Sequence, residues 1–237
     1  TVLRVEQENA VSRYRAFAIH FAVSALVVGT FMGLVLLLWY PPDLLAFAFP
    51  MRLFLTLIAV DVVAGPVLTL IVYRHGKPGL RFDLICIALV QLGFLVYGVH
   101  SAWTTRPVWL VAAAGQIDVV FANEVLPKEL AKSKLPDFLE LPKDGPRLAG
   151  ARLPEDPKER EALLMEALAG QDISRRPEYF VPYAEEAARL FERKGRRLGD
   201  GLEPLEVDIV SNRGAGFVRL DAATGQPIDS RPDPQLQ

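Results

Sequence analysis

The sequence contains a single cysteine, Cys86, and three histidines, none of which follows His100. One cysteine excludes an intrachain disulfide, so cysteine pairing cannot indicate the redox compartment. Without histidine or cysteine, the region after residue 100 cannot hold a Ser-His-Asp or Cys-His nucleophile, and a zinc site is disfavoured there. A G-x-x-x-x-G-K-[ST] phosphate loop is also missing. We therefore expect no catalytic residue, no cofactor and no resident metal.

An excess of basic residues is missing as well. The 237 residues carry 26 Lys and Arg against 28 Asp and Glu, a formal net charge of −2. The residues after 104 hold 19 basic and 23 acidic side chains, a net charge of −4. A mildly acidic region without a basic stripe is poorly suited to bind phosphates, so we expect no nucleic-acid partner.

Three long apolar runs dominate the first part of the chain, at about 17–38, 51–73 and 82–103. Each has about 20 residues or more, enough for a helix to cross a hydrocarbon core of roughly 30 Å. The alternative, buried helices of a soluble bundle, is disfavoured by three such runs in close succession. The first run is too long for a signal-peptide core, and no small-residue cleavage site follows it. We therefore predict a three-helix transmembrane region over 17–104 and no cleaved signal peptide.

Positive charges in the short flanking segments set the orientation. The segment 1–16 and the loop 74–81 each carry three Lys or Arg, whereas the loop 41–50 carries none. Lys and Arg accumulate on the cytoplasmic side, so the N-terminus and the loop 74–81 are predicted to be cytoplasmic. Residues 105–237 are then predicted to be periplasmic. Aromatic side chains expected at the outer interface are Trp39, Tyr40, Trp103 and Trp109.

Asp61 is the polar residue in the runs that most needs a partner, because a central Asp costs about 2.5–3.5 kcal/mol on insertion scales. Gln91 is expected at a similar depth in the antiparallel neighbouring helix, so a hydrogen bond between the two is predicted. Three roles stay open for Asp61: a lock between helices, a docking point for another transmembrane helix, or a proton relay. Gly65-Pro66 should loosen or kink the helix beside it.

Gly29 and Gly33 form a G-x-x-x-G pattern in the first run, which permits a close helix–helix contact. That contact is expected either within the protein's own bundle or with another helix. His20 and His100 lie near opposite ends of their helices. We therefore expect interfacial or packing histidines, and no metal shared between them.

After residue 104 the sequence predicts a small α+β domain. Expected strands are 108–113, 117–121, 206–210 and 216–220. One helix is expected from Asp156 to a stop at Gly170, and a second at 182–194. A loop with a little helix is expected over 127–154, and a turn at 221–225 before a short last strand. Helices on a small antiparallel sheet are the expected architecture. The acidic pairs Glu155/Asp156 and Glu185/Glu186 are typical of a solvated face, which does not favour catalysis.

Five segments, in this order, resemble the TfpX/TfpZ-type type IV pilin accessory proteins of bacterial inner membranes. They are Ser12-Arg13-Tyr14-Arg15-Ala16-Phe17, Trp39-Tyr40-Pro41, the stretch from Asp61 to Val72, Leu80-Arg81-Phe82-Asp83-Leu84, and Arg106-Pro107-Val108-Trp109-Leu110-Val111. The resemblance covers about residues 12–125, and beyond them mainly the Asp-x-x-Thr-Gly turn at 221–225. Family members begin just before the Ser-Arg motif, so we expect Val11 to mark an alternative start and Thr1–Ala10 to be upstream sequence.

The resemblance implies a non-enzymatic, chaperone-like protein that assists or stabilises the type IV pilin subunit before assembly. The pilin and the lipid bilayer are then the expected partners. Two other functions stay open. One is a membrane sensor or regulator whose periplasmic domain binds a ligand or partner, and the other is a membrane enzyme with its site near Asp61 or at the interface.

Overall fold

The computed structural model describes residues 12–41, 44, 48–168, 170–199, 201 and 203–233. The expectation about Val11 and Thr1–Ala10 lies outside these residues. The described chain forms two compact units. The first contains the residues up to Leu36 and Pro50–Trp103, and the second contains the described residues of Leu37–Phe49 and those from Thr104 onward.

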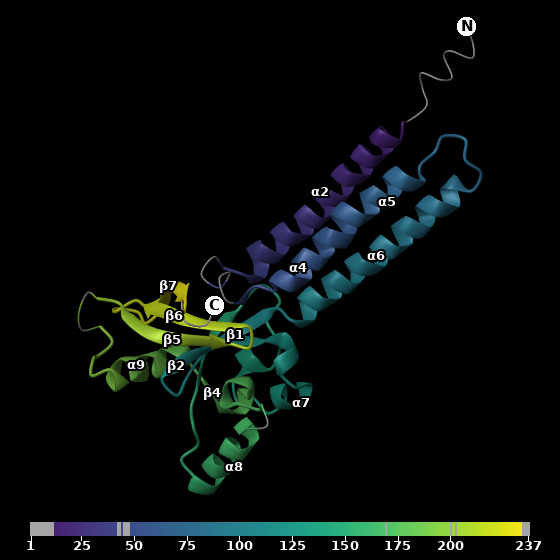
Figure 1. The fold of residues 1–237 in the computed structure, drawn as a ribbon. Coiled ribbons are helices and arrows are strands. Elements are labelled where there is room, and N and C mark those ends of the chain that lie inside the picture. Colours follow the sequence, from purple (N-terminus) through teal and green to yellow (C-terminus); the bar gives the residue numbers. More distant parts are fainter. Residues whose placement is uncertain are drawn as a thin grey trace. The chain divides into compact units, whose positions relative to one another are not determined.

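The first unit consists of three long helical segments (Figure 1). α2 spans Arg13–Trp39 and α6 spans Leu80–Thr104. The segment between them joins α4 (Met51–Leu57), the π-helical turn η2 (Ile58–Ala64) and α5 (Gly65–Val72). All three segments are long and apolar enough to cross a membrane, which confirms the predicted spans to within a few residues.

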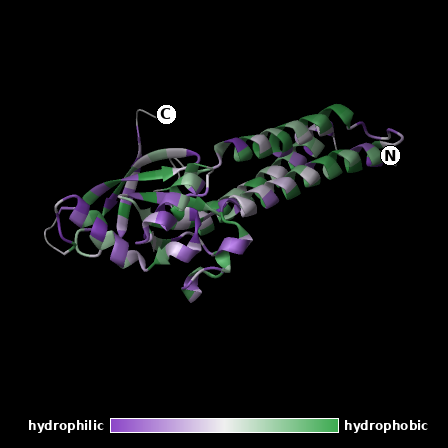
Figure 2. Ribbon diagram, turned by 90° about the horizontal axis from the view of Figure 1, so that it is seen from below, coloured by the Kyte–Doolittle hydropathy of each residue, from purple (hydrophilic) through white to green (hydrophobic). Residues whose placement is uncertain are grey.

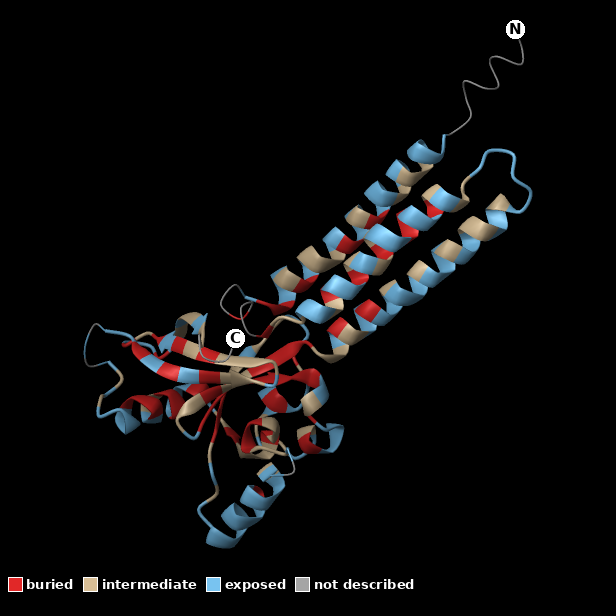
Figure 3. Cartoon of the chain, in the orientation of Figure 1, coloured by how far each residue is buried: buried red, intermediate tan, exposed pale blue. Residues whose placement is uncertain are grey.

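The outward faces of these helices are apolar. Large hydrophobic side chains such as Leu26, Ile71 and Phe82 are exposed on them. Figure 2 shows hydrophobic residues along the whole length of the helices, and Figure 3 shows that much of each helix is exposed. Exposed apolar surface on this scale is unfavourable in water and favourable in lipid. The first unit is therefore a membrane-spanning bundle.

The second unit is built on a seven-stranded sheet with the order β4-β3-β1-β2-β5-β6-β7. The strands are β1 (Pro107–Ala113), β2 (Gln116–Phe121), β3 (Arg147–Ala151), β4 (Phe180–Val181), β5 (Leu205–Ser211), β6 (Gly214–Leu220) and β7 (Pro227–Pro232). The predicted hairpin, the two later strands and the short last strand are all present. The sequence patterns missed β3, whose residues Arg-Leu-Ala-Gly-Ala have low strand propensity, and β4, which has only two residues.

The sheet is mixed, so the expected antiparallel sheet is wrong in part. β1 pairs with β3 in parallel, and β2 pairs with β5 in parallel, while the other neighbours are antiparallel. Parallel neighbours require long crossover connections. The stretch 122–146 supplies the first of these connections. It contains η3 (Ala122–Glu124), α7 (Pro127–Leu130) and η4 (Pro136–Phe138).

Helices and turns cover both faces of the central strands. α9 (Tyr183–Arg193) packs on β1 and β3, where Gly150 allows close contact with Glu186. On the opposite face, a core built around Trp109, Phe138 and Phe180 includes Leu163 of α8 (Pro157–Leu168). Ile173 of η5 (Ile173–Arg175) closes this core. The predicted helices are confirmed as α8 and α9, and Gly170 follows α8 with a φ of +85°.

Candidate functional site

Asp61 lies in the π-helical turn η2, and the backbone there explains the contacts around it. The N–H of Gly65 donates to the carbonyl of Val60, five residues earlier. In the same register the next N–H, that of residue 66, would donate to the carbonyl of Asp61. Pro66 has no N–H, so the Asp61 carbonyl needs another donor.

Gln91 of α6 supplies that donor. Its Nε2 donates to the Asp61 main-chain oxygen over 2.9 Å. Gly65 makes room for it, because a Cβ at this position would collide with Gln91 Nε2. The predicted pairing of Asp61 with Gln91 therefore exists, but through the backbone carbonyl and not through the carboxylate.

The contact continues into α2 as a chain of hydrogen bonds. Gln91 Oε1 lies 2.8 Å from His20 Nε2, and Thr69 Oγ1 lies 2.7 Å from His20 Nδ1. An amide oxygen only accepts, so His20 Nε2 carries a proton, and in the neutral ring Thr69 donates to Nδ1. His20 therefore packs between the helices, which was one of the two roles expected for it, and its hydrogen bonds connect all three spans. His100 is exposed near the end of α6.

The Asp61 carboxylate is enclosed without a hydrogen bond. Asp61 is only 4% exposed, and neither carboxylate oxygen has a partner among the described residues. Burying a polar group without a hydrogen bond costs free energy, and a buried charge costs more. The spans therefore contain the hydrogen-bonded chain of His20, Thr69 and Gln91, and beside it the buried Asp61 carboxylate, which accepts no hydrogen bond from the described residues.

The G-x-x-x-G glycines are not used for packing among the described residues. A Cβ at Gly29 or Gly33 would meet nothing within 4 Å. Close approach inside the bundle occurs instead at Gly65, next to Gln91, and at Gly98, next to Leu57. Gly98 was not among the expected contact residues, although it forms a small-xxx-small pattern with Ala102, which is also buried. The first span thus presents an open small-residue surface.

A second polar network lies in the sheet unit, around Arg213 in the turn between β5 and β6. Arg213 Nη1 donates to the Tyr40 hydroxyl over 2.8 Å and to the Ala48 carbonyl over 2.7 Å, while Nη2 donates to the Thr105 carbonyl over 3.0 Å. Its guanidinium also lies 4.1 Å from the centre of the Phe121 ring. Burial raises the pKa of the Tyr40 hydroxyl, and the positive charge of Arg213 partly offsets this rise.

Neighbouring contacts fix the same part of the second unit. Trp39 Nε1 donates to the Lys143 carbonyl over 2.9 Å. Buried Arg106 donates from Nε and Nη2 to the Pro142 carbonyl, and burial lowers the pKa of its guanidinium. The described residues of the segment that connects the first two spans, within Leu37–Phe49, therefore belong to the sheet unit. The expectation that Trp109 lies at the membrane interface is wrong, because its side chain is fully buried in the core of the sheet unit. The sequence did not predict the Arg213 anchor.

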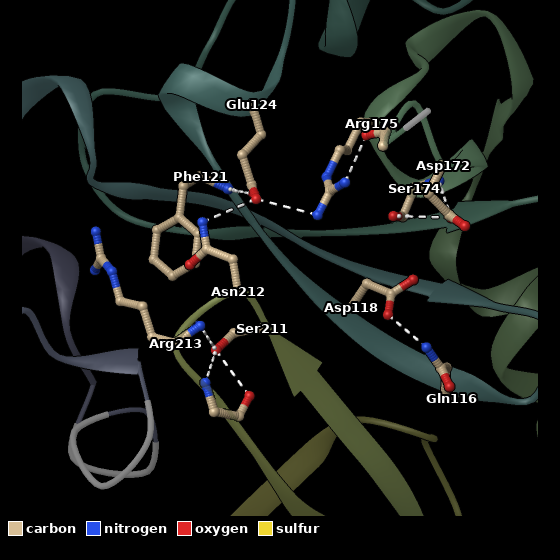
Figure 4. A network of polar contacts seen from close by, with 12 residues as sticks. Gln116, Asp118, Phe121, Glu124, Asp172, Ser174, Arg175, Ser211, Asn212 and Arg213 are labelled. Atoms are coloured by element: carbon tan, nitrogen blue, oxygen red, sulfur yellow. Dashed lines mark hydrogen bonds and ion pairs between the residues drawn. The ribbon is translucent and has the colours of Figure 1, made fainter. Parts of the chain in front are cut away.

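Glu124 connects the Arg213 turn to the rest of the sheet (Figure 4). Its carboxylate accepts from the N–H of Phe121, from Arg175 Nη2 and from Asn212 Nδ2, at 2.9, 3.1 and 3.0 Å. Asn212 directly precedes Arg213, so the turn is held on both sides. In both networks the side chains hold segments of the chain in place.

Comparisons with known proteins agree on one family. The sequence model of the fimbrial assembly protein FimB matches residues 8–42. The chain is 30% identical over 174 residues to the fimbrial assembly proteins of serogroups I and E1 of Dichelobacter nodosus, covering 73% of this chain and 67% of each relative. It is 29% identical over 117 residues to the protein of serogroups C1 and C2, covering 48% of this chain and 89% of that one. No solved structure gives a significant match. With its membrane spans, its mixed-sheet unit and this degree of identity over most of its length, the chain belongs to the family of fimbrial assembly proteins.

Proposed function

We propose that this protein is an inner-membrane accessory factor that holds the type IV pilin subunit before its assembly into the pilus. Membership of the fimbrial assembly family carries this proposal and supports a role in fimbrial biogenesis. The role is non-enzymatic. The N-terminus is cytoplasmic and the sheet unit is periplasmic, in line with the distribution of Lys and Arg in the loops.

The open surface of α2 suits the first step, recognition of the pilin helix. A pilin subunit awaiting assembly has one hydrophobic helix in the membrane and its head domain outside. Gly29 and Gly33 leave space on the lipid-facing side of α2, where another helix can approach closely. Association of helices in lipid depends on such packing, because apolar side chains gain little by leaving a lipid environment.

In-cell photo-crosslinking in a pilus-bearing host tests the proposal. Probes at Gly33 and Leu68 report on the spans, and a probe at Phe217, which is half-buried on the less buried face of β6, reports on the sheet unit. Val90 on α6 serves as a lipid-exposed control. We expect a pilin adduct from Gly33 that is stronger than any from Val90.

Each outcome has a different meaning. An adduct from Phe217 alone would place recognition in the sheet unit instead of the spans. If every probe lacks a pilin adduct while pilin stays abundant, direct handling of pilin is wrong, and a regulatory role becomes the better explanation.

A further inference from the structure

A pocket of about 260 Å³ lies in the sheet unit, where η5 meets β2 and β5. Valine side chains of β2 and β5 form part of its wall. The polar lining comes from Gln116, Asp118, Asp172, Ser174, Arg175, Ser211 and Asn212. The volume lies below the roughly 300–1,000 Å³ of pockets for drug-sized ligands, so the pocket suits a single side chain or a small molecule.

Most side-chain donors in this lining already donate to protein acceptors. Gln116 Nε2 donates to Asp118 over 2.7 Å, and Asn212 Nδ2 donates to Glu124. Arg175 donates from its two Nη atoms to Glu124 and to the Gly170 carbonyl, while its Nε atom has no hydrogen-bond partner among the described residues but is buried away from the pocket space. What the lining offers to a ligand is therefore mainly oxygen acceptors, including two carboxylates.

The charges around the pocket are unbalanced. Asp118, Asp172 and Glu124 face one cation, Arg175, which already pairs with Glu124 over 3.1 Å. Burial raises the pKa of Asp118 to about 6, and the nearby charge of Asp172 adds to the rise, whereas hydrogen bonds from Gln116 and Ser174 and the charge of Arg175 oppose it. Burial and the charge of Asp172 thus outweigh the groups that stabilise the Asp118 carboxylate. In Figure 4, its second oxygen points towards the Asp172–Ser174 pair.

We propose that this pocket binds a primary ammonium group on a short alkyl stem, with Asp118 and Asp172 receiving the ammonium and the valines contacting the stem. An ammonium has three donors and no acceptor, which matches a lining of acceptors. A lysine stem readily lies along apolar surface while its charged end reaches polar groups. The ammonium comes either from a lysine of a partner protein or from a free alkylamine. This inference goes beyond the proposed role in handling pilin and does not depend on it.

Other ligand classes fit less well. Calcium takes six to eight oxygen ligands, and no group of three or more His, Cys, Asp or Glu side chains suited to a metal occurs among the described residues. An anion would face two carboxylates, and Arg175, the one cation among the described lining residues, is already paired with Glu124.

Titration of the detergent-solubilised full chain with n-butylammonium at pH 8, followed by NMR, tests the proposal. We expect saturable shifts at Ser174 and Asp118 with a Kd on the order of 1 mM, and no such shifts with the neutral isostere n-butanol. Asp118→Asn and Asp172→Asn should each raise the Kd at least tenfold. Asp208→Asn removes the same charge from an exposed position of β5 outside the pocket, and should leave the Kd within twofold. Equal shifts with n-butanol, or binding that survives both pocket variants, would overturn the proposal.

Carbodiimide crosslinking of native membranes distinguishes the two sources, because it joins a carboxylate to an amine in direct contact. A peptide containing Asp118 or Asp172 joined to a lysine of another protein identifies a protein ligand. Saturable n-butylammonium binding without such a peptide identifies a free amine. Absence of both results overturns the proposal, whether or not pilin adducts form at Gly33.

Discussion

The side-chain amide of Gln91 donates to the main-chain carbonyl of Asp61 over 2.9 Å, at the position where Pro66 removes the backbone donor. A proline in one span is thereby compensated by a glutamine in another. The same glutamine accepts from His20, so one side chain serves all three spans.

Gln91→Leu should destabilise the bundle. The change leaves the Asp61 carbonyl and His20 Nε2 without partners, and interhelical hydrogen bonds in membranes are worth about 0.6–2 kcal/mol each. We expect a loss of about 1–3 kcal/mol in unfolding titrations with SDS in mixed micelles. Leu92→Ala, on the exposed side of the same helix, should cost less. Because Pro66→Ala restores a donor to η2, Gln91→Leu should cost less in that background, and strict additivity would contradict this explanation.

Gly65→Ala should lower the stability of the bundle, whereas Gly29→Ala should affect the pilin adduct. A Cβ at Gly65 would collide with Gln91, so Gly65→Ala should lower bundle stability by about 1–3 kcal/mol, as overpacking does. Gly29 has open space around it, so its alanine variant should keep bundle stability and instead weaken the pilin adduct at Gly33. The proposal for the open surface of α2 would be wrong if Gly29→Ala left that adduct unchanged.

Asp61→Ala should leave the helices packed. Gln91 bonds to the backbone of residue 61, and that bond survives removal of the side chain. Because the buried carboxylate has no partner among the described residues, the variant should insert normally and match or exceed the wild type in stability. We predict weaker pilus assembly in cells, measured by surface pilin. Wild-type assembly would count against any functional role of the carboxylate.

Arg213→Met should release the segment between the first two spans from the sheet unit. The variant loses three hydrogen bonds from a charged donor, of the kind worth roughly 1.5–3 kcal/mol each, although their losses do not add fully. Chymotrypsin should then cleave after Trp39 and Leu44, neither of which is followed by proline, at least tenfold faster. Arg219→Met, which removes an exposed ion pair with Asp229, is the matched control and should have little effect. Equal cleavage of the two variants would show that Arg213 is not the anchor.

Because of Asp118, the sheet unit should be more stable in mild acid than at neutral pH. Its folded-state pKa of about 6 lies above the ordinary value of 3.8, so between pH 4 and 6 the folded state binds more protons than the unfolded state. Its contribution to stability therefore falls as pH rises through this window and is constant above about pH 6.5. Pulse proteolysis should show that the free energy of unfolding of the sheet unit falls by roughly 1–3 kcal/mol as the pH rises from 4 to 6. Asp118→Asn should remove that slope and be more stable than the wild type at pH 8, while Asp208→Asn should keep it.

The three spans could be predicted from sequence because each is a local property, a run of about 20 apolar residues. The hairpin of β1 and β2 and the helices α8 and α9 were predictable for a similar reason, since periodicity, caps and turns are local signals. The pairing of Asp61 with Gln91 was also accessible, because depth follows from counting residues along antiparallel helices. The family could be identified from the order of its motifs.

Only the tertiary structure decided which atoms meet. Gln91 contacts the carbonyl of Asp61 because the π-helical register and Pro66 together leave that carbonyl free, and no sequence pattern indicates this register. The parallel pairing of β1 with β3 depends on a long crossover through weakly patterned sequence. Arg213 and Tyr40 are separated by 173 residues, and Glu124 and Asn212 by 88. Contacts over such separations arise from chain topology, so the anchor and the pocket became visible only once the sheet was assembled.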